Sequence, residues 1–315
     1  MNTAPLRLAG FAAVLALAFG GAAVAGDAFG PGDSGRGEAP AHDNGQENHV
    51  TTAHGADSAD GGHADAGHGG GAETHPVRGL AVAENGLRVV VENPELRRGR
   101  SERLRFRIVR DGSGRTVRDF DVEHEKRMHL IVARRDLTGF QHLHPRQARD
   151  GAWTTDVEIG DPGSYRLFAD FSHAGEPYTL ASDLRVDGRA DLRDLPAPAR
   201  SATSDLGYEV RLDAGRVQPG EAAELSLTIL RDGRPVHVEP YLGAGGHLVA
   251  LRDGDLAFLH VHPTGHGDGD DARGGGHDDG VGFEATFPTE GRYRLFLQFQ
   301  HEGRVHTVAF TQEVS

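Results

Sequence analysis

Two copies of one histidine pattern, H-x12-H-x-H-P, constrain this chain most strongly, because they divide it into two related halves. The first copy spans residues 129–145 and the second spans 247–263, and the two align without a gap. A second shared phrase, at 163–175 and 291–303, adds a further histidine to each half. For a chain of 315 residues, a duplication of this kind predicts two domains of the same fold.

Short apolar and β-branched runs between turn residues predict strands in both halves, with no helical period. We therefore expect an all-β chain of two tandem Ig-like or cupredoxin-like sandwiches, repeat 1 at 80–187 and repeat 2 at 206–315, joined by a linker at 188–205. The strands expected in repeat 1 are 87–92, 103–109, 115–122, 128–133, 140–144, 153–159, 164–171 and 178–186.

The spacing of each copy predicts a β-hairpin that gathers its histidines on one face. A two-residue turn at Asp253-Gly254 would place His247 directly opposite His260. Because side chains alternate between the faces of a strand, His262 shares the face of His260. The equal spacing predicts the same facing in the first copy, for His129, His142 and His144.

Apolar rows indicate which face this is. The odd positions of 165–173 and 293–301 are mostly large and apolar, and the rows end in His173 and His301. We therefore expect the four histidines of each half at the end of a sandwich core.

Four imidazoles at the end of a dry cavity suit a borderline divalent ion, with copper(II) or zinc as the favoured cofactor. The expected ligands are His129, His142, His144, His173, His247, His260, His262 and His301. The alternative is a set of hydrogen-bonded histidines at the edge of a core, since a duplication copies structural residues as well.

Residues 1–25 have the pattern of a secretory signal peptide. Arg7 is the positive region, 8–19 is the apolar run, and Ala23-Val24-Ala25 is an A-x-A cleavage site. We expect a secreted or cell-envelope protein, anchored in the membrane if the signal is not cleaved. No later stretch is long and apolar enough to span a bilayer.

Two segments, 26–79 and 264–280, are rich in Gly, Asp and His. The first contains too few large apolar residues to fold and is expected to be disordered, and the second is expected to be a surface loop close to the proposed site. The second is an acidic loop inserted directly after the second histidine pattern. The first segment either binds metal or is a solvated spacer, and the loop is either a metal-capturing lid or a tolerated insertion. Their weaker metal candidates are His42, His49, His54, His63, His68 and His75 in the first, and His266 and His277 in the second.

Composition excludes several classes of function. These two segments carry most of the net charge of −14, so they attract cations, and no basic patch for nucleic acid remains. The chain has no cysteine, which excludes disulfides, a cysteine nucleophile and a blue-copper site. With only two methionines, a methionine-rich copper(I) site is not expected.

The paired H-x12-H-x-H-P segments after a signal peptide resemble secreted Ig-like bacterial proteins of the YtkA-like type. More distantly, they resemble periplasmic copper chaperones that carry an H…M…H-x-M pattern. The resemblance implies a sandwich that carries copper without redox chemistry, with His142, His144, His260 and His262 at the H-x-M-like positions. Histidine in place of methionine favours copper(II), zinc or nickel over copper(I).

The sequence therefore predicts an exported divalent-metal-binding protein, a buffer, scavenger or metallochaperone rather than an enzyme. Its expected partners are metal ions and an exported metal-handling protein. The first alternative is an extracellular Ig-like structural or adhesion module with structural histidines. The second is a metal-dependent hydrolase or oxygenase, for which the nearby acids are Glu123, Glu125 and Asp170 in repeat 1 and Glu239 in repeat 2, where Gln298 stands at the position of Asp170.

Overall fold

The computed structural model describes residues 77–204, 206–264 and 280–315, and each half of this part is a β-sandwich. The expected signal peptide, the segment 26–76, the eight weaker histidine candidates, and the side chains of His260 and His262 lie outside the described residues. Every regular element in the described ranges is a strand, which confirms the all-β class. A helix able to cross a membrane is not found there.

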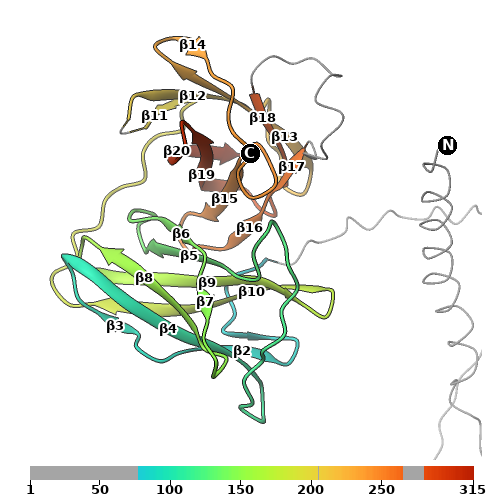
Figure 1. The fold of residues 1–315 in the computed structure, drawn as a ribbon. Helices are drawn as coiled ribbons and strands as arrows, with labels where there is room; N and C mark the ends of the chain where they lie inside the picture. Colours follow the sequence, from blue (N-terminus) through green and yellow to red (C-terminus); the bar gives the residue numbers. More distant parts are fainter. Residues whose placement is uncertain (1–76, 205, 265–279) are drawn as a thin grey trace, which may run out of the picture. The chain divides into compact units, whose positions relative to one another are not determined.

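The first sandwich packs a sheet of order β1-β2-β4-β8-β7 against one of order β3-β10-β9-β5-β6 (Figure 1). The bounds are β1 Ala83–Glu84, β2 Leu87–Val91, β3 Glu95–Leu96, β4 Arg100–Arg110, β5 His129–Arg134, β6 Gln141–Leu143, β7 Arg146–Gln147, β8 Trp153–Ile159, β9 Gly163–His173 and β10 Glu176–Val186.

The second sandwich repeats this plan, with a sheet of order β11-β12-β13-β18-β17 against one of order β16-β15-β19-β20. A short strand, β14, also pairs with β13. The bounds are β11 Ser201–Thr203, β12 Tyr208–Asp213, β13 Ala222–Arg231, β14 Arg234–Pro235, β15 His247–Arg252, β16 Phe258–His260, β17 His262–Thr264, β18 Gly280–Thr286, β19 Gly291–His301 and β20 Arg304–Val314.

Each sandwich has its own core, built from the inward side chains of both sheets. The apolar rows expected along β9 and β19 lie in these cores. The row of β9 is Tyr165, Leu167, Ala169 and Phe171, and that of β19 is Tyr293, Leu295, Leu297 and Phe299. The sequence pattern therefore identified the inner faces of these two strands correctly.

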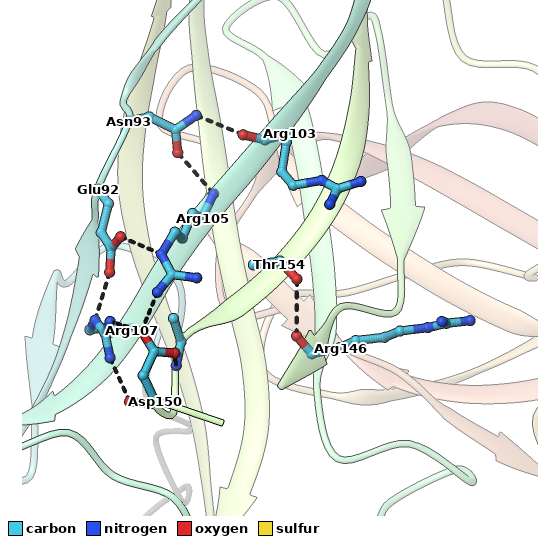
Figure 2. Close-up of polar contacts among 9 residues, drawn as sticks. Glu92, Asn93, Arg103, Arg105, Arg107, Arg146, Asp150 and Thr154 are labelled. Carbon is cyan, nitrogen blue, oxygen red and sulfur yellow. Dashed lines mark hydrogen bonds and ion pairs between the residues drawn. The ribbon is translucent and has the colours of Figure 1, made fainter. Parts of the chain in front are cut away.

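The outward face of β4 carries a row of arginines that is neutralised locally. Arg105 and Arg107 both pair with Glu92 and with Asp150, as Figure 2 shows. After β2 ends, the Asn93 side chain accepts from the backbone N–H of Arg105 at 2.8 Å and so continues the sheet ladder. Exposed ion pairs contribute little to stability, so this surface is a solvated, charge-balanced face.

A third apolar cluster joins the two sandwiches, which lie in one compact unit of the chain. It forms between the outer faces of β5 and β9 and those of β15 and β19, so β5 is buried on both faces. Its members are Ile131, Ala133, Leu137, Phe168 and Ala181 from repeat 1 and Val249, Leu251, Leu256, Phe258 and Phe296 from repeat 2. A proline-containing linker suggests two domains with few cross-contacts, and that expectation is wrong.

Two other expectations differ from the structure. Residues 115–122 do not form a strand, because Val117 N–H donates to Ile108 in one sheet and Asp121 N–H donates to Ser172 in the other. The segment therefore crosses between the sheets. The second sandwich also begins before 206, because β11 pairs with β12.

The second histidine hairpin has a longer turn than the two-residue loop expected at Asp253-Gly254. Arg252 N–H donates to the carbonyl of Ala257, and His260 pairs with Val249 instead of His247. The first copy has the same shift, with Ile131 opposite His142. A shift of two residues preserves facing, so the histidines of the first hairpin still share one face.

Candidate metal centre

The histidines of the first hairpin lie on the outer face of their sheet, toward repeat 2, and not at the end of the sandwich core. In the pairing of β5 with β9, His129 is opposite Asp170 and Ile131 is opposite Phe168. These even-numbered positions of β9 face away from its core row. The expectation of a core-end site is therefore wrong, because apolar residues beside a histidine can belong to an inter-repeat cluster as well as to a core.

Three of the expected ligands come together here. One ligand atom from each of His129, His142 and His144 lies within 4.8 Å of the other two. The ring centroids are 5.3 Å apart for His129 and His142, 5.1 Å for His129 and His144, and 4.9 Å for His142 and His144. Two imidazoles on one tetrahedral zinc ion, with Zn–N bonds of about 2.0–2.1 Å, have centroids roughly 5 Å apart. The three rings match that geometry.

Hydrogen bonds on the far side of two rings fix their tautomers. Nε2 of His129 is 3.2 Å from the backbone carbonyl oxygen of Glu123, and Nδ1 of His142 is 2.7 Å from Oε1 of Gln298. Both oxygens accept, so both of these ring nitrogens donate. The opposite nitrogens, Nδ1 of His129 and Nε2 of His142, then present lone pairs to each other at 3.0 Å. A cation between them relieves this repulsion.

His144 adds a third nitrogen with unsatisfied hydrogen-bonding capacity. Its Nε2 is buried and has no hydrogen-bond partner among the described residues. A buried polar atom without a partner is costly, and each such atom in a native structure calls for an explanation. A metal ion bound by all three rings would satisfy His144 and separate the facing lone pairs of the other two.

His124 belongs to the same cluster and was missed by the sequence analysis. Its ring centroid lies 4.9 Å from that of His247 and 6.2 Å from that of His129. It sits with Glu125 at the centre of a tight turn, where both residues have positive φ, 45° at His124 and 64° at Glu125. In repeat 2 the matching turn has Leu242, so a search for histidines shared by the two repeats passes over His124.

The surroundings favour neutral imidazoles. Burial, followed by repulsion from neighbouring histidines, lowers the pKa of His142 well below its ordinary value. The same two causes, in the same order, lower the pKa of His144 to about 4 and that of His247 to about 3. Neutral imidazole is the form that binds a metal.

These shifts predict that acid destabilises the metal-free protein. The unfolded chain takes up protons on histidine near pH 6.5, while the folded cluster resists protonation until lower pH. The contribution of these neutral histidines to the free energy of unfolding should therefore be complete above about pH 6.5 and decline as the pH falls toward 4. Urea unfolding at pH 7.5, 6 and 4.5 measures this decline, and His144→Gln should make it shallower. An equal midpoint at all three pH values would contradict the prediction.

The other expected ligands do not join this group in the same way. His247 lies beside it, with its ring centroid 6.0 Å from that of His129 and 6.1 Å from that of His142. Nδ1 of His173 lies 2.8 Å from the carbonyl oxygen of Asp119, and Nδ1 of His301 lies 2.7 Å from the Tyr208 hydroxyl. Both belong to the inner-face rows, so the structure does not bring these two histidines to the cluster.

The pocket at the cluster is small, about 30 Å³, and both repeats line it. From repeat 1 it is lined by His129, His142 and Asp170, and from repeat 2 by His247 and Val249. Pockets for small organic molecules are usually about 300–1,000 Å³. The space suits an ion rather than an organic substrate.

Residues 81–188 and 202–315 match the family described as Domain of unknown function (DUF8832). No curated protein matches the chain. The family match lends no support to the expected resemblance to YtkA-like proteins or copper chaperones.

Solved structures with some similarity include two bacterial adhesins. The Escherichia coli adhesin FdeC is 14% identical, with 75% of this chain and 66% of that chain covered and a TM-score of 0.25. The Yersinia pseudotuberculosis adhesin InvE is 11% identical, with 75% and 61% covered and a TM-score of 0.21. Salmonella alpha-2-macroglobulin is 13% identical, with 76% and 15% covered and a TM-score of 0.24. This chain thus spans less than two thirds of each, and TM-scores this low carry no argument about function.

Proposed function

The chain belongs to the DUF8832 family of unknown function, and from the geometry of its histidine cluster we propose that it binds a divalent transition metal. The ligands are His129, His142 and His144. Because the sequence begins with a signal-peptide pattern, the proposed setting is outside the cytoplasm, where the protein buffers, scavenges or delivers the metal.

The observation that carries the proposal is the convergence of one ring nitrogen from each of three histidines, all within 4.8 Å of one another. Nδ1 of His129 and Nε2 of His142 face each other as acceptors, and the buried Nε2 of His144 has no hydrogen-bond partner among the described residues. Ordinary structural histidines pair a donor with an acceptor. The convergence of three imidazole nitrogens on one point is an arrangement that binds a divalent transition metal.

The donor set restricts the choice of metal. Imidazole nitrogen suits zinc, copper(II) and nickel, whereas calcium and magnesium prefer oxygen ligands. The absence of cysteine and the scarcity of methionine disfavour copper(I). Zinc or copper(II) is therefore the proposed cargo.

The competing proposals are an Ig-like structural or adhesion module and a metal-dependent enzyme. Two of the similar solved structures are adhesins, but their TM-scores of 0.25 and 0.21 lend no weight to the adhesion module. For the metal-dependent enzyme, two of the nearby acids already accept hydrogen bonds from other side chains: Glu123 from Ser172, and Asp170 from Thr179 at 2.7 Å.

Zinc titration of the full chain and of a variant lacking residues 26–76 tests the proposal. The full chain should bind several zinc ions, because the deleted segment carries six histidines that bind weakly at the cost of ordering the chain. The variant should retain one tight ion, because ligands held on a sheet are preorganised. Loss of all zinc binding with the segment would contradict the proposal and leave the adhesion module as the leading alternative.

A further inference from the structure

We propose that the metal site is completed by repeat 2, with His247 as a fourth ligand and Gln298 as a positioning residue for His142. This inference rests on the proposed function, since it requires a metal at His129, His142 and His144. It goes further by making the site a shared centre between the repeats, so that one ion per chain holds the two sandwiches together.

Gln298 reaches the site from β19 of repeat 2. Its Oε1 accepts from Nδ1 of His142 at 2.7 Å, and its own Nε2 donates to the hydroxyl of Thr307 at 3.2 Å. Gln298 is 7% exposed, so these contacts are shielded from water. Metal-binding histidines commonly donate their second ring N–H to a carbonyl or carboxylate, which fixes the tautomer and the ring orientation. Here the fixing oxygen comes from the other repeat.

His247 is placed by the same two strands. In the pairing of β15 with β19, it lies directly opposite Gln298. Its Nε2 is 3.5 Å from the carbonyl oxygen of Leu242, so the ring N–H points to that carbonyl and Nδ1 carries the lone pair. The ring is stacked on that of His129, with an interplanar angle of 23° and a centroid separation of 6.0 Å.

The position of His247 is close to that of a bound ligand. Its centroid separations of 6.0 Å and 6.1 Å from His129 and His142 exceed the separation for a tetrahedral ion, roughly 5 Å, by about one ångström. A side-chain rotation covers such a distance without moving a strand. With three histidines from repeat 1, His247 gives four nitrogen ligands, which is the coordination number of structural zinc sites.

The two repeats therefore use matching positions for one centre. His129 begins β5 and His247 begins β15, and both strands contribute to the apolar cluster between the sandwiches. Among the described side chains, the first histidines of the two copies thus meet at one shared site. An ion bound across this boundary adds its binding free energy to the docking of the repeats.

The test uses the full chain, a competition titration with zinc, and the visible spectrum of the cobalt(II)-loaded form. The variants are His247→Ala, Gln298→Leu and Gln298→Glu, with His237→Ala as the matched control, because His237 is an exposed histidine of repeat 2. His247→Gln replaces His247→Ala if the latter does not give the far-UV circular dichroism of the wild type.

Loss of His247 should weaken zinc binding at the tight site at least tenfold, and it should change the cobalt spectrum from that of a tetrahedral centre. Gln298→Leu should weaken binding about 10–100-fold, as for other groups that orient metal ligands. Gln298→Glu should restore binding, because its carboxylate still accepts from His142. The His237 control should bind as the wild type does.

Wild-type affinity and an unchanged cobalt spectrum in both His247→Ala and Gln298→Leu would overturn the inference and leave a site built by repeat 1 alone. That outcome would leave the proposed function intact. Failure of the proposed function has a different result, in which the His142→Ala/His144→Ala double variant binds zinc as tightly as the wild type.

Discussion

Replacing Phe168 with alanine should cost about 3–5 kcal/mol of stability and uncouple the unfolding of the two sandwiches. Phe168 is fully buried on the outer face of β9, within the apolar cluster that joins the repeats. Its ring centroid is 5.7 Å from that of Phe258, on the other repeat. Removing the ring leaves a cavity between the sandwiches, so the interface loses both buried area and packing.

Calorimetry measures this effect directly. The wild type should unfold in one transition, and Phe168→Ala should separate it into two. The matched control is Phe171→Ala, which removes a ring from the core of repeat 1 and leaves the interface in place. The control should lower the melting temperature while keeping a single transition. Two independent transitions already in the wild type would show that the apolar cluster does not couple the repeats.

The second large effect concerns the stabilisation that zinc provides. An ion that binds only the folded state stabilises it by about 2.7 kcal/mol at a free concentration of one hundred times its dissociation constant. For a folded unit of this size, that corresponds to a rise in melting temperature of roughly 5–10 °C. His142→Ala combined with His144→Ala should abolish the rise, because two of the three converging ligands are lost.

Thermal unfolding with zinc and with a chelator measures this rise. His173→Ala combined with His301→Ala is the matched control, because both histidines belong to the expected ligand set and lie outside the cluster. The control should keep the zinc-dependent rise. If the rise persists in the His142/His144 variant, the stabilising ion binds elsewhere.

Much of the fold follows from the sequence because its signals are local. Strand alternation along 165–171 and 293–299 correctly identified the inner rows, and the repeated pattern indicated two sandwiches of one fold. The turn assignment is wrong, but the histidines of the first hairpin still share one face. The register differs by two residues, and side chains alternate between faces with that period.

The position of the cluster could not be read from the same signals. A strand such as β5 is apolar on both faces when one face packs on its own core and the other on a second domain. Alternation cannot separate these cases, so His129 was assigned to the core end. The contribution of Gln298 depends on docking between repeats, which local pattern does not encode. Comparison of the two repeats does not identify His124, because repeat 2 has Leu242 at the matching position.

Anomalous diffraction at the zinc absorption edge, from crystals of the zinc-loaded chain, tests the central claim most directly. The account predicts a strong peak about 2.0–2.1 Å from Nδ1 of His129 and from Nε2 of His142 and His144. An anomalous map with no peak among these three rings, in crystals that contain zinc elsewhere, would contradict it.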